Sequence, residues 1–341
     1  MGEGAHRPTI KEVAQRAGVS PMTVSRTLSG GLNVRPDVQE RVLAAVTELG
    51  YHRNENARSI RPGHSSGLIG VAITNIANPY YSTFALGVEE EAALAGRRIL
   101  LGNTSEDVGR EVALVNDFLG RRVDGLIVVP AGSASEHLAH SQNQGVPVVL
   151  ASRRIDALAA DSVVLTDDDG AHRGTIALID RGHTRIGYLG NALSIFTGER
   201  RHAGFVRAMA ERGLGPDPRL IATNQQTVDQ AREAMRSLLH AKNPPTAVFC
   251  ANNRNAIGAV KEIHQQLHTG LRSVSDFPEI MSFDDFELAE LSPVPISVID
   301  HDPRELGRTA ARLLLDRLEG AHRDAVPRAI ELPVSLRVGV R

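Results

Sequence analysis

The residues best suited to specific chemistry lie on one short helical segment near the beginning of the sequence. Ser20 can cap a helix whose first residue is Pro21, a position where the missing N–H costs nothing. Val24 and Leu28 lie on one face of this helix. The other side carries side chains that are mostly small and polar or basic: Met22, Ser25, Arg26 and Ser29. A helix with such a face fits the major groove of DNA, where base edges can be read. The pattern therefore suggests recognition of nucleic acid.

Two further helices are predicted around that segment. Thr9 and Glu12 have the spacing of a capping box, and Gly18 ends the first helix. Pro36 opens a third helix, whose apolar stripe is Val38, Val42, Ala45, Val46 and Leu49, with Gly50 as its end. A helix, a tight glycine-containing turn and a capped second helix form the helix-turn-helix arrangement. The pattern alone leaves open a three-helix bundle that does not bind DNA.

Composition bounds the class of protein. The chain has 341 residues, 42% hydrophobic and 23% charged, which is ordinary for a globular protein, and it lacks an apolar run long enough for a membrane span. Residues 1–63 carry nine basic and six acidic side chains, whereas the remainder carries 29 basic and 34 acidic ones, so a basic head precedes an acidic body.

The single cysteine, Cys250, excludes an internal disulfide, and the first residues contain no secretory signal. We expect a cytoplasmic protein.

The ordered run from Thr9 to Leu28, TIKEVAQRAGVSPMTVSRTL, resembles the DNA-binding head of LacI/GalR-family transcriptional regulators. The resemblance continues through Arg41-Val42, Ala44-Ala45 and Leu49-Gly50-Tyr51, and into residues 54–60. It implies a homodimer, with a tetramer as the alternative, that places two recognition helices on a pseudo-palindromic double-stranded operator. By this resemblance the base-reading residues are Pro21, Met22 and Arg26, and the phosphate contacts come from Thr9, Ser20, Thr23 and Ser25.

Residues 54–61 resemble the hinge helix of the same family, which orders on the operator and presses an apolar side chain into the minor groove. The positions implied are Asn54, Ala57, Arg58 and Ile60, where Ile60 replaces the usual leucine. Two departures add positive charge: Arg53 replaces the usual proline, and Arg35 stands where a serine often caps the third helix.

From residue 67 onward, short apolar runs alternate with amphipathic segments, which predicts parallel sheets wrapped by helices. The runs are 68–73, 99–101, 126–129, 146–150, 163–165, 186–189, 247–250 and 296–299. About 275 residues exceed one such sheet, so we expect an α/β core of two lobes, similar over its length to the family's periplasmic-binding-protein-like core. The expected divisions are a head at 1–53, a hinge and linker at 54–66, and a core at 67–341. Within the core, the N-lobe takes about 67–165 and 300–326, and the C-lobe about 166–295 and 327–341, with crossings near residues 165, 295 and 326.

Polar side chains follow the predicted strands, where open α/β sheets place ligands. The candidates for an effector site are Asn78, Tyr80, Ser152, Arg153, Thr197, Arg201, Asn252, Asp284 and His301. For any single one of them, a helix N-cap is the alternative. For Arg201, Asn252 and Asp284, similarity to the family's effector-binding positions favours ligand contact.

Departures from the family bear on the kind of effector. Ser152 stands where the family often has aspartate, Gln226 where an aromatic residue often stacks on sugars, and Ile195 where purine-binding members have arginine. Pro278 and Glu279 interrupt the strand expected before Asp284. The default is a small polar, carbohydrate-like effector, with a nucleoside or another metabolite as the alternative. The alternative of another class is a solute-binding protein without DNA function.

Enzyme motifs are weak. Residues 63–67, GHSSG, match a hydrolase nucleophile elbow, but a helix is expected before them and a strand after, the inverse of the required context. His264 and His268 have the spacing of zinc ligands on a helix, yet Gln265 stands where a metalloprotease has glutamate. Cys250 closes an apolar strand and is expected to be buried. We therefore expect a transcriptional regulator that acts as a repressor, without catalytic residues, metal or cofactor.

Overall fold

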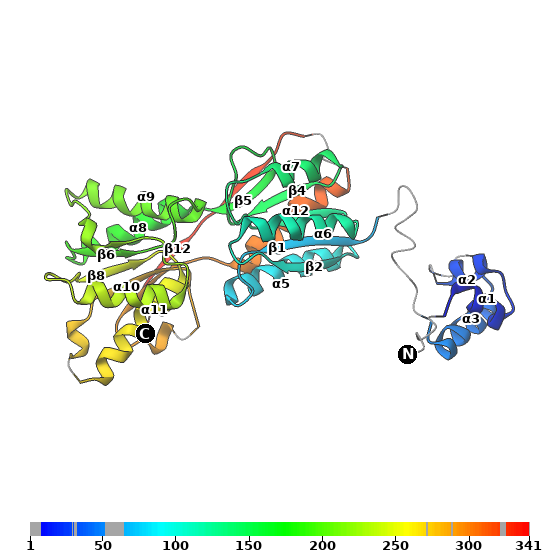
Figure 1. The fold of residues 1–341 in the computed structure, drawn as a ribbon, viewed down its shortest axis with the longest axis horizontal. Helices are drawn as coiled ribbons and strands as arrows, with labels where there is room; N and C mark the ends of the chain where they lie inside the picture. Colours follow the sequence, from blue (N-terminus) through cyan, green and yellow to red (C-terminus); the bar gives the residue numbers. More distant parts are fainter. Residues whose placement is uncertain are drawn as a thin grey trace. The chain divides into compact units, whose positions relative to one another are not determined.

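The fold is described from a computed structural model, which describes residues 8–28, 30, 33–51, 65–270, 272–287, 289–320 and 325–340. The chain divides into two compact units, Met1–Ser66 and Gly67–Arg341, shown in Figure 1. No helix in the described ranges is long and apolar enough to cross a membrane.

The described part of the first unit contains three helices, as predicted: α1 (Ile10–Ala17), α2 (Pro21–Thr27) and α3 (Pro36–Leu49). Thr9 caps α1 through a reciprocal capping box with Glu12, and Gly18 ends it in the left-handed conformation at φ 66°. The helices enclose a small apolar core made of Val13, Ala14, Ala17, Val24, Val42 and Ala45. The predicted helix-turn-helix head is thus confirmed, and the two parallel-sheet lobes described next confirm the α/β class of the core.

The N-lobe is a six-stranded sheet in the order β11-β5-β4-β3-β1-β2, and every neighbouring pair is parallel. Its strands are β1 (Leu68–Ile73), β2 (Arg98–Asn103), β3 (Gly125–Val128), β4 (Val148–Ala151), β5 (Asp161–Leu165) and β11 (Ala329–Leu332). Helices α5 (Pro79–Leu94) and α12 (Pro303–Leu318) pack together on one face. Helices α6 (Val108–Gly120) and α7 (Glu136–Asn143) contribute to the apolar cluster on the other face.

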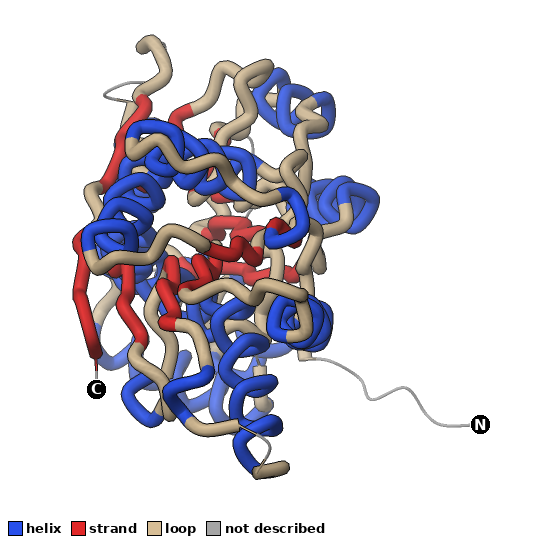
Figure 2. Tube along the Cα trace, turned by 90° about the vertical axis from the view of Figure 1, so that its left-hand side faces the viewer, coloured by secondary structure: helices blue, strands red, loops and turns tan. Residues whose placement is uncertain are grey.

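The C-lobe is a second six-stranded sheet in the order β12-β10-β9-β8-β6-β7, parallel except for the antiparallel pairing of β12 with β10. Its strands are β6 (Ile186–Leu189), β7 (Ile221–Ala222), β8 (Ala247–Cys250), β9 (Glu279–Phe283), β10 (Ile296–Asp300) and β12 (Ser335–Val340). Its α-helices are α8 (Asp167–Asp180), α9 (Phe196–Glu211), α10 (Val228–Leu239) and α11 (Asn253–His268). Short 3₁₀ turns lie at Pro218–Leu220, Val274–Asp276 and Ala289–Leu291. Figure 2 shows strands of the core at the centre with helices around them, and further strand segments along the edge that leads to the C-terminus.

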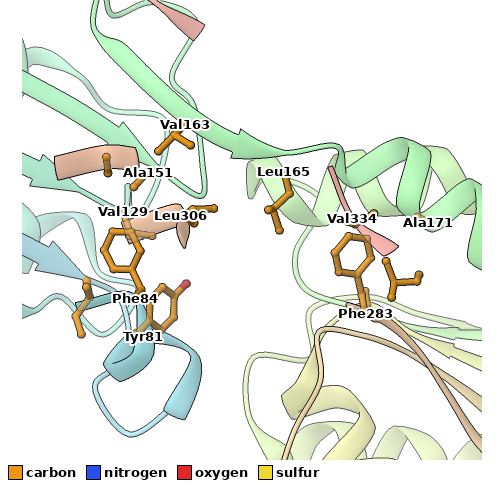
Figure 3. Packing of buried hydrophobic residues seen from close by; sticks show 14 of the residues in the cluster. Tyr81, Phe84, Val129, Ala151, Val163, Leu165, Ala171, Phe283, Leu306 and Val334 are labelled. Atoms are coloured by element: carbon orange, nitrogen blue, oxygen red, sulfur yellow. The ribbon is translucent and has the colours of Figure 1, made fainter. Parts of the chain in front are cut away.

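One buried apolar cluster extends through both lobes. It includes Phe84 and Leu306 in the N-lobe, Phe283 in the C-lobe, and Leu165 and Val334 at two of the crossings between them (Figure 3). The lobes are therefore joined by packed side chains as well as by the chain itself.

Two predicted crossings between the lobes are wrong in position. The second follows Asp300 rather than residue 295, because β10 pairs with β9 in the C-lobe sheet. The third lies between Leu332 and Ser335 rather than near 326, because β11 pairs with β5 in the N-lobe. Residues 329–332 therefore belong to the N-lobe, although the sequence analysis placed them in the C-lobe. The second error concerns an edge strand, β11, whose pairing partner β5 lies far away in the sequence.

The expected interruption before Asp284 is also wrong. Pro278 precedes β9, and Glu279 begins the strand, so the ladder is intact from Glu279 to Phe283. The Glu279 carboxylate is satisfied by Arg181, at 3.2 Å from its Nε, and by the ring of His183, at 3.1 Å. The Glu279 carboxylate is tolerated at this strand end because the Arg181 guanidinium and the His183 ring bind it.

Candidate functional site

The polar face of α2 is presented to solvent by a firmly capped helix. Ser20 Oγ accepts a hydrogen bond from the backbone N–H of Thr23 at 3.2 Å, and Pro21 occupies the first turn. Val24 and Thr27 are buried in the head. The three predicted base-reading residues are all exposed: Pro21, Met22 (64% exposed) and Arg26.

Three of the four predicted phosphate contacts, Thr9, Ser20 and Thr23, lie at the starts of α1 and α2, and the fourth, Ser25, is the fifth residue of α2. The Thr9 hydroxyl donates to the Glu12 carboxylate at 2.9 Å, and the hydroxyls of Ser20 and Thr23 are 3.0 Å apart. Ser25 is half-buried. Arg35 occupies the N-cap position of α3 but forms no side-chain hydrogen bond to the helix. The arginine that replaces the family's usual serine therefore leaves α3 without a side-chain cap. The predicted hinge residues Asn54, Ala57, Arg58 and Ile60, together with Arg53, lie outside the described residues.

A cavity of about 260 Å³ lies between the two lobes of the core. Eight of the nine predicted effector residues line it: Asn78, Tyr80, Ser152, Arg153, Thr197, Arg201, Asn252 and Asp284. The ninth, His301, does not line the cavity; its Nε2 lies 3.1 Å from an oxygen of Asp284, and its ring contacts the Tyr80 ring. These residues meet because the carboxyl ends of parallel strands in both sheets face the same space.

The N-lobe wall centres on a buried guanidinium. Arg153 donates through both terminal nitrogens to the Glu106 carboxylate, at 2.6 and 2.7 Å, and also to the Pro130 carbonyl at 2.7 Å. Burial by itself lowers the pKa of a guanidinium, but neighbouring Tyr81 and Glu106 raise that of Arg153. Arg153 therefore stays charged, and the Glu106 carboxylate of the same lobe neutralises its charge.

The Tyr80 and Ser152 hydroxyls lie 3.1 Å apart on the same wall. Burial, reinforced by the charge of Asp284, raises the pKa of Tyr80 well above its usual value. The phenol therefore remains neutral at physiological pH and can both donate and accept hydrogen bonds.

The C-lobe wall centres on a second buried guanidinium. Arg201 donates from Nε to Asp167 at 2.7 Å and from Nη1 to the Ala251 carbonyl at 2.6 Å, and it lies 3.4 Å from Asp284. Burial alone would raise the pKa of Asp284, but Arg201 and His301 hold it below its ordinary value. For Asp167, burial dominates and raises the pKa. Asp284 therefore offers a charged acceptor to the cavity.

Backbone strain gathers at this cavity. Ser105, Glu106, Ser152 and Asp284 all have left-handed backbone conformations, with φ between 55° and 69°. Such conformations are costly for residues other than glycine and are characteristic of binding sites. They aim polar side chains from the strand ends into the space between the lobes.

A reciprocal amide pair joins the lobes beside the cavity. The Asn78 side chain accepts from Asn253 Nδ2 at 2.8 Å and donates to Asn253 Oδ1 at 3.3 Å. Asn78 also caps α5, and Asn253 is the first residue of α11. This contact holds the two walls of the cavity together directly.

Several lining residues were missing from the predicted set: Asn75, Glu106, Asn191, Gln226, Asn253 and Arg254. Asn75, Asn191 and Asn253 follow the ends of β1, β6 and β8, and a position after a strand end is the same signal that identified the predicted residues. Glu106 follows β2 inside an acidic run that reads equally well as a helix start. Gln226 lies in the cavity wall, at the position where the family that the sequence resembles often has an aromatic residue.

The residues of the possible enzyme motifs do not line this cavity. Ser65 and Ser66 lead into β1, so the pattern at 63–67 has no following helix. His264 and His268 are neighbours on α11, with ring centroids 6.3 Å apart, and no group of three metal-ligating side chains occurs among the described residues. Cys250 is buried at the end of β8, and burial raises the pKa of its thiol.

Comparison with known proteins places these features in a family. Residues 9–54 match the family of bacterial regulatory proteins called the lacI family, and residues 176–339 match a periplasmic binding protein-like domain. The chain is 31% identical to the HTH-type transcriptional repressor PurR of Aliivibrio salmonicida, over 93% of this chain and 94% of that protein. It is 32% identical to catabolite control protein A of Priestia megaterium, over 90% of this chain and 91% of that protein.

Among solved structures, the lac repressor dimer bound to operator and the anti-inducer ONPF aligns with a TM-score of 0.83 and 27% identity, over 98% of this chain and 99% of that one. The exposed face of α2, the two-lobed core and these full-length matches agree. This chain therefore belongs to the lacI family of bacterial regulatory proteins and is a DNA-binding transcriptional regulator.

Proposed function

We propose that this regulator acts in the cytoplasm as a homodimeric repressor, whose two heads bind successive major-groove half-sites of a pseudo-palindromic operator. The observation that carries this proposal is the exposed pair Met22 and Arg26 on a capped helix whose opposite side is buried. Arg26 is suited to a bidentate contact with guanine, and Met22 offers apolar contact. Pro21 is the third base-reading position, and the hydroxyls of Thr9, Ser20, Thr23 and Ser25 bind phosphates.

Residues 54–61 take the role of a hinge in this proposal. Ile60 is the apolar wedge for the minor groove, with Asn54, Ala57 and Arg58 beside it. A branched aliphatic side chain can unstack a base step and bend the duplex.

The cavity between the lobes is the proposed effector site. Its hydroxyl, amide, carboxylate and guanidinium groups suit a small polyhydroxylated ligand, since each ligand hydroxyl both donates and accepts. Binding there changes lobe closure and hence the spacing of the two hinge segments. The effector shifts operator affinity only as far as its own affinity differs between the two lobe arrangements.

The DNA-binding proposal is tested by retardation of duplexes selected from random oligonucleotides. Arg26→Ala should weaken binding to the selected operator by about 10- to 100-fold and relax the preference at one base pair, since a bidentate base contact is worth about 1–3 kcal/mol. The control Arg35→Ala removes an exposed guanidinium outside α2 and should keep the base preference. Equal affinity of the Arg26→Ala protein for selected and scrambled duplexes, with no loss relative to the unaltered protein, contradicts the assignment.

The effector class is tested by thermal unfolding in the presence of sugars, sugar derivatives and nucleosides. A ligand that binds the folded core raises its Tm in proportion to its occupancy. We expect carbohydrate-like compounds to raise the Tm. A rise with nucleosides alone would replace the carbohydrate assignment with the nucleoside one.

A further inference from the structure

Three arginines line the cavity, and they differ in what neutralises them. Arg153 is paired with Glu106, and Arg201 with Asp167 and Asp284. Arg254 also lines the cavity and is partly buried, but it makes no hydrogen bond or ion pair with any residue that the structure describes. Arg254 is thus the one cavity arginine whose charge the described part of the chain leaves unanswered.

The position of Arg254 is unfavourable for a cation on other grounds too. It is the second residue of α11, a helix of 16 residues whose first turn contains no acidic side chain. The amino end of a helix carries partial positive charge, so a guanidinium there is repelled by the backbone. Its placement is not explained by stability, which is the pattern expected of residues kept for binding.

We propose that the effector carries an anionic group, a carboxylate on a small hydroxylated compound, which binds Arg254. This inference rests on the proposed function, because it assigns a chemical class to the ligand of the same cavity. A guanidinium matches a carboxylate in plane and charge and can bind it through two parallel hydrogen bonds. One unpaired cation balances one negative charge, whereas a phosphate ester carries about two at neutral pH.

The rest of the lining suits the hydroxylated part of such a compound. Asn75, Asn191 and Thr197 supply amide and hydroxyl groups around the space, and Gln226 replaces an aromatic stacking face with a further amide. The cavity of about 260 Å³ is at the lower end of the size of small-molecule sites, so the ligand has about the bulk of one sugar unit.

The first test needs no ligand. In chloride buffer the full-length Arg254→Gln protein should unfold about 1–3 °C higher than the unaltered protein, because glutamine keeps the helix propensity and removes the repelled charge. The control Lys261→Gln removes an exposed cation from the middle of the same helix and should leave the Tm unchanged within about 1 °C. An unchanged or lower Tm for Arg254→Gln overturns the proposal.

The second test compares probes at equal ionic strength: D-gluconate, D-glucose, D-glucose 6-phosphate and inorganic phosphate. Gluconate should raise the Tm of the unaltered and Lys261→Gln proteins, and its affinity should fall about 10- to 100-fold in Arg254→Gln. Equal responses of the three proteins to gluconate overturn the assignment to Arg254. A response to the phosphates alone overturns the carboxylate, and a response to glucose alone overturns the anionic group.

These outcomes are separate from the test of DNA binding. Operator selection is carried out with the unaltered, ligand-free protein, so it reports on the head whether or not Arg254 binds an anion. A protein that retards operator but fails both cavity tests refutes the anionic effector only.

Discussion

Asp161 shows how one buried carboxylate can organise a region of this core. Its oxygens accept hydrogen bonds from Arg317 at 2.7 and 2.9 Å, and from the backbone and side chain of Arg328 at 2.7 and 3.1 Å. Asp161 begins β5, Arg317 lies at the end of α12, and Arg328 directly precedes β11. The carboxylate therefore holds β11 against β5, the pairing that decides which lobe this segment joins.

Asp161→Asn should lower the free energy of unfolding by about 3 kcal/mol, because it leaves two guanidiniums without their shared anion. Urea denaturation at neutral pH measures this change. Asp156→Asn is the matched control: the Asp156 side chain is 82% exposed and its ion pair among the described residues is with Arg154, so its loss should change stability by less than about 0.5 kcal/mol. Equal effects of the two substitutions would contradict the role given to Asp161.

The same carboxylate predicts a pH dependence. Burial alone would raise the pKa of Asp161, but Arg317 and Arg328 hold it below its ordinary value. A lowered pKa in the folded state means that the contribution is complete above the unfolded value, near pH 4, and is lost as pH falls below it. Between pH 5 and pH 3, the unaltered protein should therefore lose more stability than the Asp161→Asn protein. Parallel curves over this range would show that Asp161 titrates normally.

At the scale of elements, the close packing of α5 against α12 and of α8 against α9 requires glycines where the helices touch. A Cβ on Gly87 of α5 would collide with the Arg304 carbonyl of α12, and a Cβ on Gly307 would collide with the Phe84 carbonyl. Gly204 of α9 meets the backbone of α8 in the same way. Because the opposing atoms are backbone, no rotamer change can relieve these contacts.

Gly307→Ala should therefore lower the free energy of unfolding by about 3 kcal/mol, since α5 and α12 must move apart. Gly120→Ala is the control within a helix: nothing lies within 4 Å of a Cβ at the end of α6, and alanine there should be neutral or stabilise by up to about 1 kcal/mol. Chemical denaturation of the two variants gives the comparison. A stabilising Gly307→Ala would mean that the helices do not pack this closely.

At the scale of the whole core, Asn78 and Asn253 form hydrogen bonds from one wall of the cavity to the other. The pair links the two lobes, so an effector binds to walls that are already held near each other. An equilibrium of this kind is sensitive to small energies, because about 1.4 kcal/mol changes a population ratio tenfold.

Asn253→Ala should open the core, seen as a larger radius of gyration in solution scattering, and should weaken effector binding by about 3- to 10-fold. Asn78→Ser removes the partner amide but keeps a side chain able to cap α5. The double substitution should add little to either single one, because both remove the same contact. Additive effects would show that the two amides act independently of each other.

Local signals in the sequence were enough to identify the head. Capping residues, glycine stops and apolar spacing all lie within a few residues of each other, and the helices they predict around Thr9, Ser20 and Pro36 are present. The ends of strands are also marked by short-range patterns in the sequence. For this reason, eight of the nine residues predicted from their positions near strand ends do line the cavity. Their partners were not visible: nothing near Arg153 in the sequence indicates Glu106, and nothing near Asn78 indicates Asn253.

The sequence by itself determined the class of fold, the DNA-binding head and the set of polar groups delivered to the cleft, because each depends on short-range pattern. Only the tertiary structure decided where β11 belongs, which arginines of the cavity are neutralised and that Arg254 is not. Those outcomes depend on contacts between residues 34 to 175 positions apart, where pairing is selected by burial and charge as the chain folds.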